Sequence, residues 1–278
     1  MNQRLPLPPR EGDHARFERI LAESRRHRAS LWLWAAGLAV LYIFSLRVGG
    51  VDIGRLIDGM PRLAGWLAKA WPPNLEDLDA VLRGAAETVA IATLGTTLGA
   101  LIAVPLCLAA AHNLSPTPLV YWPARALLNG LRAIDTFVFA LLFVAAVGLG
   151  PFAGILGLGL HVAGSVAKLW SEEIEATDPR PIEAASVTGA SRLLVVRYAL
   201  LPAVAPQLAS IVLYMWEFNI RSSTVLGLVG AGGIGQQLKN AVDLLDFARL
   251  ATIILVILAM VAVADGLSAL VRRRLVGS

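Results

Sequence analysis

Four ionisable residues lie inside segments of the sequence that are otherwise apolar. Arg132 and Asp135 are three residues apart, and Glu217 and Arg221 are four apart, so on a helix each pair would share one face. Ionisable side chains are costly inside a bilayer and usually face the protein interior or a water-filled path. Two interpretations stay open for these residues: local ion pairs that hold helices together, or the lining of a path for a charged solute.

Other polar residues of the same segments extend the candidate path. Asn219 lies within the second pair, and His161 and Lys168 lie seven residues apart, on nearly one face of an earlier segment. We expect Asn219 and His161 on the path. The long side chain of Lys168 is expected to carry its ammonium group to the membrane interface instead.

A polar stretch between two apolar segments carries a regular pattern of small residues. The pattern comprises Glu183, Ala184, Ala185, Gly189, Leu201 and Pro202. Thr177 or Asp178 can cap a short helix that begins at Pro181, because proline is tolerated in a first turn and an acid there favours the helix dipole. The alanines and the glycine would leave a low surface that fits a groove on another protein, with the glutamate at its edge. The alternative is an amphipathic loop helix that packs on its own bundle.

A glycine-rich stretch follows the segment that holds Arg221. Gly230, Gly232 and Gly235 match the GxGxxG pattern of dinucleotide-binding proteins, which requires a strand before it, a helix after it and an acidic residue about 20 residues further on. Here the glycines follow an apolar segment, so we expect no nucleotide site. Together with Gly233, they allow sharp backbone turns or close helix packing.

The composition places all these residues in an integral membrane protein. Of 278 residues, 56% are apolar and only 16% are charged, against about 25% charged in ordinary globular chains, and the mean hydropathy is +0.66. The single cysteine, Cys107, excludes a disulfide-stapled secreted domain.

Nucleic-acid binding and catalysis have little support in the sequence. The net charge of +4 comes without a basic patch of interleaved aromatic residues, so we expect no nucleic-acid partner. No metalloprotease, serine-hydrolase or Walker A pattern occurs, so we predict no catalytic residue and no metal site.

Five uncharged windows organise the chain, each near the roughly 20 residues that a helix needs to cross a bilayer. They cover residues 29–46, 88–111, 136–160, 198–216 and 250–264. Gly148, Gly150 and Pro151 interrupt the third window, so we divide it into a hairpin of two spans. The sequence thus predicts an all-α integral membrane fold with six transmembrane helices.

The predicted organisation begins with a polar tail over residues 1–28, part of it a surface helix over 14–28, and a first transmembrane helix over 29–48. Residues 49–82 combine prolines and tryptophans in a way typical of an amphipathic segment at the membrane interface. Residues 83–278 form a core with five further spans, at about 83–111, 125–147, 152–174, 203–226 and 247–271. The polar loop 175–202 lies within this core.

The distribution of Lys and Arg predicts the orientation. Six spans place both termini on one side, where Lys and Arg outnumber those of the opposite loops roughly two to one. Both termini and the loop 175–202 are therefore predicted to be cytoplasmic, and residues 49–82 periplasmic. In this topology Arg221 lies near the outer mouth of the path and Arg132 in the inner half.

The small-residue pattern resembles the EAA motif of ABC importer permeases, in which EAA is followed by three residues, Gly, nine residues, Ile, one residue, Leu and Pro. All spacings agree, and one position departs, because Ala199 stands at the family's Ile. The stretches RAIDTFVFALLFVAAVGLGPFAG from Arg132, His161 to Glu175, and FNIRSSTVLGLVGAGGIG from Phe218 are similar to permeases of phosphonate importers, a group with relatives that move phosphite. The resemblance covers residues 72–278.

This resemblance implies a type I ABC importer permease fold in the bacterial inner membrane. Two copies would form a homodimer around one path, and two ATPase subunits, which bind ATP and Mg, would dock on the helix around Glu183. A periplasmic binding protein would bring the substrate to the glycine-rich element, a short re-entrant or surface structure. The chain itself would carry no cofactor. Arg132 and Arg221 would assist a tetrahedral oxyanion, which guanidinium groups suit.

Three alternatives stay open. The first is an ABC importer for another small anion or an amino acid. The second is a stand-alone secondary transporter, which would need inverted repeats that the sequence does not show. The third is a membrane enzyme acting on lipid phosphate, for which no nucleophile and base stand out.

Overall fold

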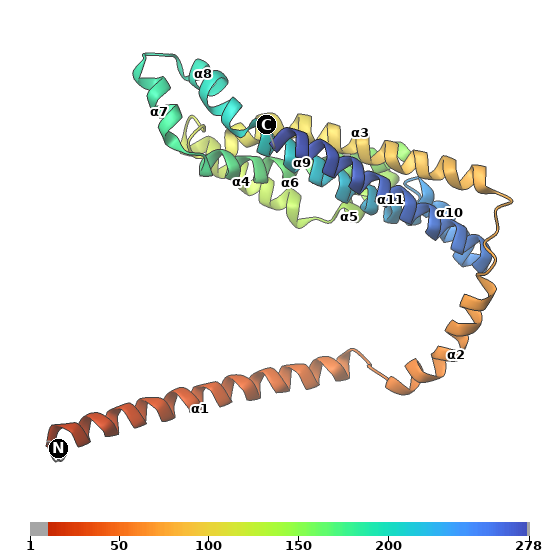
Figure 1. Cartoon of the computed structure of the whole chain (residues 1–278), viewed down its shortest axis with the longest axis horizontal. Coiled ribbons are helices and arrows are strands. Elements are labelled where there is room, and N and C mark those ends of the chain that lie inside the picture. The colour runs from red at the N-terminus through yellow and green to blue at the C-terminus, as the bar shows by residue number, and fades with distance from the viewer. Residues whose placement is uncertain (1–10, 277–278) are drawn as a thin grey trace, which may run out of the picture. The chain divides into compact units, whose positions relative to one another are not determined.

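The computed structural model of the protein describes residues 11–276, and in this range the chain is helical and has no strand (Figure 1). The long helices are α1 (Glu11–Val48), α2 (Ile53–Lys69), α3 (Leu78–Ala110), α4 (Pro118–Ala133), α5 (Thr136–Val147), α6 (Pro151–Ala176), α9 (Leu201–Leu226) and α11 (Phe247–Val276). The short elements are α7 (Pro179–Val187), α8 (Arg192–Val195), a π-helical turn (Val196–Leu200), a 3-10 turn (Gly227–Val229) and α10 (Ile234–Asp243). By its contacts the chain divides into two units, one up to Ala64 and one from Gly65.

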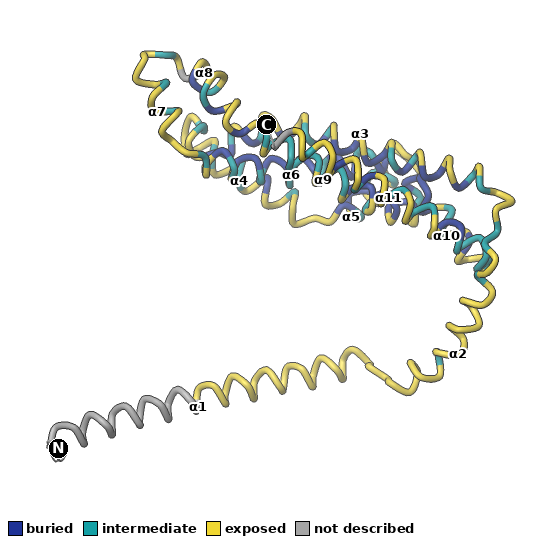
Figure 2. The backbone as a smooth tube through the Cα atoms, viewed as in Figure 1, coloured by how far each residue is buried: buried dark blue, intermediate teal, exposed yellow. Residues whose placement is uncertain are grey.

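The first unit is built on α1. Its apolar part, Ser30–Val48, is long enough to cross a bilayer and is exposed along its whole length, as Figure 2 shows. The predicted helix over 14–28 is present, and it is continuous with the apolar part, because α1 begins at Glu11 and runs to Val48 without a break. No proline or turn signal separates the two parts, which explains the continuity. Residues 1–10 of the predicted tail lie outside the described residues.

Residues 65–77 attach the amphipathic segment to α11 within the second unit. The ring of Trp66 stacks on that of Phe247, with centroids 5.4 Å apart. The backbone of Asn74 donates to the carbonyl of Ala248 at 3.2 Å and accepts from the hydroxyl of Thr252 at 2.6 Å. The predicted amphipathic character is seen in α2, which is helical and has no buried residue.

Helices α3 and α6 form the centre of the second unit. Gly95 of α3 lies against Leu158 of α6, and Gly99 lies against Val162. The second contact is four residues further along both helices, so the two helices run in the same direction. A Cβ atom at position 99 would lie 2.6 Å from the Cβ of Val162, closer than real Cβ atoms approach. Small residues at this spacing let two backbones come together, which is how helices associate in a membrane.

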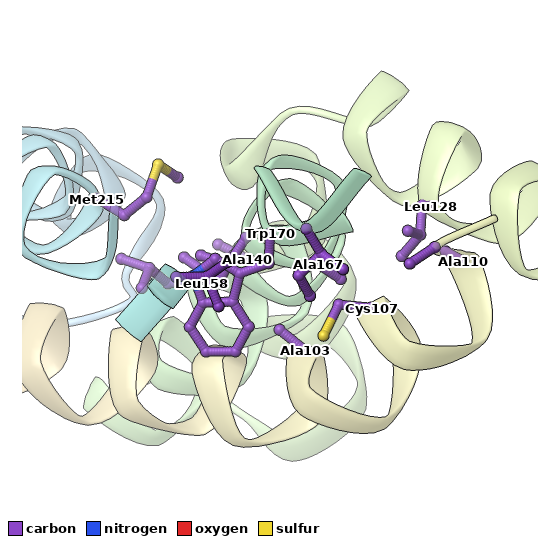
Figure 3. Packing of buried hydrophobic residues seen from close by; sticks show 14 of the residues in the cluster. Ala103, Cys107, Ala110, Leu128, Ala140, Leu158, Ala167, Trp170 and Met215 are labelled. Carbon is purple, nitrogen blue, oxygen red and sulfur yellow. The ribbon is translucent and has the colours of Figure 1, made fainter. Parts of the chain in front are cut away.

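A cluster of buried apolar side chains joins this pair to α4, α5 and α9 (Figure 3). Cys107 on α3 and Trp170 on α6 lie in it, and the indole Nε1 of Trp170 donates to the carbonyl of Leu208 on α9 at 3.1 Å. The buried, unpaired thiol of Cys107 fits the packing role expected from its apolar window. We call the end of the bundle that holds Ala110 and Ala176 the α7 end, and the opposite end the α10 end.

The third predicted span is broken in two. Residues 125–147 were expected to form one helix, but α4 ends at Ala133, α5 begins at Thr136, and the two are bent by 88°. The cause is Asp135, whose carboxylate accepts the backbone N–H of Phe137 at 2.8 Å and so starts a new helix as its N-cap. The described residues therefore hold five helices able to cross a membrane, or six if the bent pair counts as one span.

The other predicted spans agree with the structure to within a few residues. The hairpin divided at Gly148 and Gly150 is present as α5 and α6, and both glycines have positive φ angles, 95° and 134°, which suit the tight turn. The fifth and sixth spans correspond to α9 and α11. The all-α membrane fold predicted from the sequence is confirmed.

The contact at Gly99 leads to a first prediction. Gly99→Ala should destabilise the protein by about 1–3 kcal/mol, because the methyl group overpacks the α3–α6 contact. Gly130→Ala is the matched control, since no atom lies within 4 Å of its Cβ position on α4, and alanine is the better helix former. Thermal unfolding of the purified protein in detergent measures both, and equal midpoints for the two variants would contradict the packing argument.

Candidate coupling surface and charged cluster

Helix α7 carries the EAA-like pattern, and Asp178 starts it. Its carboxylate accepts from the Arg180 backbone N–H at 3.0 Å and from the Arg180 guanidinium at 2.6 Å. The guanidinium, and then the backbone N–H, hold the pKa of Asp178 below its ordinary value. The helix begins at Pro179 and not at the predicted Pro181, because Asp178 is the N-cap residue. Thr177, the other predicted cap, is the C-cap of α6.

The pattern residues divide between a packed side and an open side of α7. Ile182 packs on the buried core and Ala185 is half-buried, whereas Glu183 and Ala184 are exposed. In the part of the chain that the structure describes, no hydrogen bond or ion pair engages the Glu183 carboxylate. The open side thus presents an unengaged carboxylate next to a small residue.

Gly189 follows α7 in a left-handed backbone conformation with a φ of 77°. No atom lies within 4 Å of the position that its Cβ would occupy. Backbone conformation, and not close packing within this chain, therefore requires glycine here. Leu201 and Pro202 form the first turn of α9, so the pattern spans α7, the loop after it and the start of the next long helix.

A second candidate site lies where α9 packs on α11. Arg221 bonds Glu217 at 2.5 Å and lies 3.5 Å from Asp265. Glu217 also lies 3.4 Å from Arg272, which donates to the hydroxyl of Ser268 at 3.0 Å. The four charged residues, Glu217, Arg221, Asp265 and Arg272, form a single network with no net charge, which we call the charged cluster.

The charged cluster is open on one side. The exposed fraction of the side chain is 51% for Arg221 and 46% for Asp265, but 18% for Glu217. Both helices are otherwise apolar and long enough to cross a membrane. Charged groups at such positions face water or protein in preference to lipid, so the cluster requires a water-filled path or another chain in front of it.

The sequence predicts half of the charged cluster. The Glu217–Arg221 pair is confirmed, but Asp265 and Arg272 are not among the predicted site residues. Asp265 directly follows the last uncharged window, and Arg272 was assigned to the basic residues beyond the span. Their spacing of seven residues, which places both on one helix face, is the signal that could have found them.

Asn219 faces into the bundle, away from the charged cluster. It is fully buried, and its Nδ2 donates to the Thr96 hydroxyl of α3 at 2.8 Å. Among the described residues, its Oδ1 and the buried hydroxyl of Ser223 have no hydrogen-bond partner. Thr96 lies near the middle of α3, and Arg221 lies five residues before the end of α9 at Leu226, so its position near the outer mouth of the path stays a prediction.

Arg132 and Asp135 do not lie on one helix, so the shared helix face predicted from their spacing is wrong. Arg132 is exposed in the last turn of α4, and Asp135 caps α5 across the bend. The described range holds no ion pair between them. The break placed between the two residues by the Asp135 cap is the physical reason.

His161 supports the bend between α4 and α5. Its Nδ1 lies 3.0 Å from the carbonyl oxygen of Ile134, the residue at the bend. A carbonyl can only accept, so Nδ1 carries the proton in this contact. Lys168 pairs with Glu172 at 2.9 Å, one turn nearer the α7 end, in line with the expected reach of its side chain.

The glycine-rich element folds into the α10 end of the bundle. Gly230, Gly232 and Gly233 have φ angles near 80°, and Gly235 lies against the backbone of Thr224. The backbone N–H of Ile234 donates to the buried Thr88 hydroxyl of α3 at 2.8 Å, and the Gly230 carbonyl accepts from the Gly150 N–H at 2.8 Å. A helix and not a strand precedes the glycines, so the context of a dinucleotide fingerprint is missing.

The described residues include no group of three or more His, Cys, Asp and Glu side chains that could hold a metal ion. What the geometry offers is an exposed face of α7 at one end of the bundle and a charged cluster between α9 and α11. Such an arrangement suits a transport component that works with partners.

Comparisons with known proteins define the class: the permease component of an ABC importer. Residues 91–277 match the family model of the binding-protein-dependent transport system inner membrane component, and the chain belongs to this family. The chain is 46% identical over 96% of its length to HtxC of Stutzerimonas stutzeri, whose name assigns it to a phosphite transport system and of which the match covers 92%. It is 41% identical to the phosphite transport system permease protein PtxC of the same organism, over 81% of this chain and 82% of that one.

A solved structure confirms the fold. A chain of the inward-facing MetNI methionine ABC transporter superposes with a TM-score of 0.65 at 21% sequence identity, covering 72% of this chain and 98% of that one. The type I importer permease fold implied by the motif is therefore confirmed. The chain is a multi-pass protein of an inner-membrane family whose members work with binding proteins.

The charged cluster leads to a second prediction. Glu217→Gln should lower the free energy of unfolding by about 1–3 kcal/mol more than Asp265→Asn, because Glu217 is the more buried acid and pairs with both guanidiniums, whereas Asp265 pairs with Arg221 alone. Both substitutions remove one negative charge and keep the side-chain size. Melting midpoints of the purified variants compare them, and a larger loss for Asp265→Asn would contradict the geometry of the network.

Proposed function

We propose that this permease moves phosphite, phosphonate or a similar tetrahedral oxyanion into the cell. The observation that carries the proposal is the identity of 46% with HtxC over nearly the full length of both chains. A second relative, PtxC, is also named for phosphite transport. The charged cluster supplies guanidinium groups of the kind that suit such anions, each balanced by a carboxylate, so that the path favours passage over tight binding.

Coupling to ATP is proposed to occur at α7. The exposed Glu183 and Ala184, with Gly189 and its open surroundings, form a low surface at the α7 end that a partner ATPase subunit can cover. In this proposal the ATPase subunits bind ATP and Mg, and the permease serves as their transport component.

Two copies of the chain are proposed to surround one path. The half-exposed Arg221 and Asp265 support this, since they lie on apolar helices and need water or protein in front of them. The distribution of basic residues supports an orientation with both termini and the loop 175–202 in the cytoplasm and the glycine-rich element toward the periplasmic binding protein. Closure of two ATPase subunits on ATP moves α7, opens the path outward, and hydrolysis resets it.

The chemistry of the substrate gives a third prediction. In vesicles that hold the permease with its ATPase subunit and binding protein, phosphite and methylphosphonate should stimulate ATP hydrolysis, and methionine and sulfate should not. Phosphate release measures the response, with vesicles lacking the binding protein as the control. Stimulation by methionine instead would favour the amino-acid alternative, and transport without any ATPase subunit would favour a secondary transporter.

The docking surface gives a fourth prediction. Glu183→Lys should change the free energy of unfolding of the isolated permease by no more than about 0.5 kcal/mol, because the carboxylate has no bond to any described residue. Its affinity for the ATPase subunit should fall about tenfold or more, a loss of about 1.4 kcal/mol.

Co-purification of the ATPase subunit measures this affinity. Glu76→Lys is the matched control, since it reverses the charge of an exposed residue before α3, at the other end of the bundle. Normal ATPase retention by Glu183→Lys would show that this face of α7 is not the docking surface.

A further inference from the structure

Arg125 is the hub of a polar network at the α7 end. Its Nε donates to the carbonyl of Ala110, in the last turn of α3, at 2.9 Å. Its Nη2 donates to both carboxylate oxygens of Glu175, near the end of α6, at 2.6 Å each. The Arg125 side chain is only 13% exposed although it carries a charge. One guanidinium on α4 thus holds the ends of two other helices.

Glu175 completes the network from the side of α6. Its Oε1 also accepts the backbone N–H of His112, which follows the end of α3, at 2.6 Å. Next to it, the Asn113 side chain donates to the carbonyl of Ile174 at 3.0 Å. The last carbonyls of a helix lack partners within their own helix, and Arg125 satisfies one of these, the carbonyl of Ala110. Glu175 satisfies the N–H of His112, just beyond the end of α3. We call Arg125 and Glu175, with the Ala110 carbonyl and the His112 N–H, the end clamp.

The end clamp lies next to the proposed coupling helix in the chain. Residues 176–178 separate Glu175 from α7, and this link is short and stiff. The Thr177 hydroxyl donates to the Glu173 carbonyl at 2.9 Å, Asp178 caps α7, and Pro179 fixes the first backbone angle of the helix. A displacement of α7 is therefore passed to the end of α6.

We propose that the end clamp is the device that turns a displacement of α7 into a joint movement of α3, α4 and α6. The inference rests on the proposed coupling role of α7 and assigns Arg125 and Glu175 as positioning residues that touch neither substrate nor nucleotide. Arginine suits the role because its planar fork reaches a carbonyl and a carboxylate at once, which a lysine ammonium on a flexible stem does not hold in fixed geometry. Without the clamp, α6 would follow α7 alone.

The first test measures coupling in the complete assembly. In vesicles with the ATPase subunit and binding protein, Arg125→Gln should keep ATP hydrolysis but lower the phosphite transported per ATP about tenfold. Arg125→Lys should lower this ratio less, because lysine keeps the positive charge and loses only the planar guanidinium. Arg83→Gln is the matched control, since it breaks an equally short pair, Arg83–Asp79 at 2.6 Å, that is exposed and lies within one helix. An unchanged ratio in both Arg125 variants overturns the proposal.

The second test needs no substrate and so stays informative if phosphite is not the cargo. Spin labels at cysteines replacing Thr117 and Ala176, in a Cys107→Ser background, report the distance between α4 and the end of α6. Both residues are exposed. With the clamp intact, one narrow distance should persist with and without ATP, and Arg125→Gln should broaden it when ATP is bound. A distance that changes with ATP in the unsubstituted clamp shows that these helices do not move together and overturns the proposal.

Discussion

The close approach of α3 and α6 is the constraint on which the rest of the second unit depends. Lipid tails are as apolar as leucine, so membrane helices associate through tight packing and interhelical hydrogen bonds. Gly95, Gly99 and Gly159 bring the two backbones together. Helices α4, α5 and α9 then pack on α6, so the bend, the end clamp and the polar contacts of α9 all take their positions along this pair.

The parts of the molecule that depend on local sequence could be predicted. A run of apolar residues must become a helix in a membrane, because its backbone groups have no water to bond, and the spans α3, α6, α9 and α11 agree with this rule. The small-residue pattern from Glu183 to Pro202 predicted a short helix in a polar loop, and α7 is that helix. Only its start differs, because Asp178 caps the helix and α7 therefore begins at Pro179, two residues before the predicted Pro181.

The parts that depend on which helices meet could not be predicted. Asp135 looked like half of an ion pair from its spacing, yet as an N-cap it bends the chain, and nothing in the spacing separates the two roles. The partners of Glu217 and Arg221 lie on α11, more than forty residues away, and only the packing of α9 on α11 brings them together. The role of Glu175 could not be predicted for the same reason, because its partner Arg125 lies on another helix, fifty residues away in the sequence.

The two connections of α7 differ in stiffness, and this difference decides what a displacement of α7 does. Toward α6 the link is two residues, Thr177 and Asp178, which cap the two helices. Toward α9 the connection runs through Gly189, the short α8 and a π-helical turn. Such π-helical turns are rare and are frequently found at functional sites. In the proposed coupling, the α3–α4–α6 block follows α7 directly, and α9 follows with a change at its base.

The contact that would adjust is the one between α9 and α3, where Asn219 meets Thr96. Among the described residues, the buried Oδ1 of Asn219 and the buried hydroxyl of Ser223 have no hydrogen-bond partner. Unpaired buried polar groups weaken a packed contact, so this contact gives way more readily than the glycine-packed contact between α3 and α6.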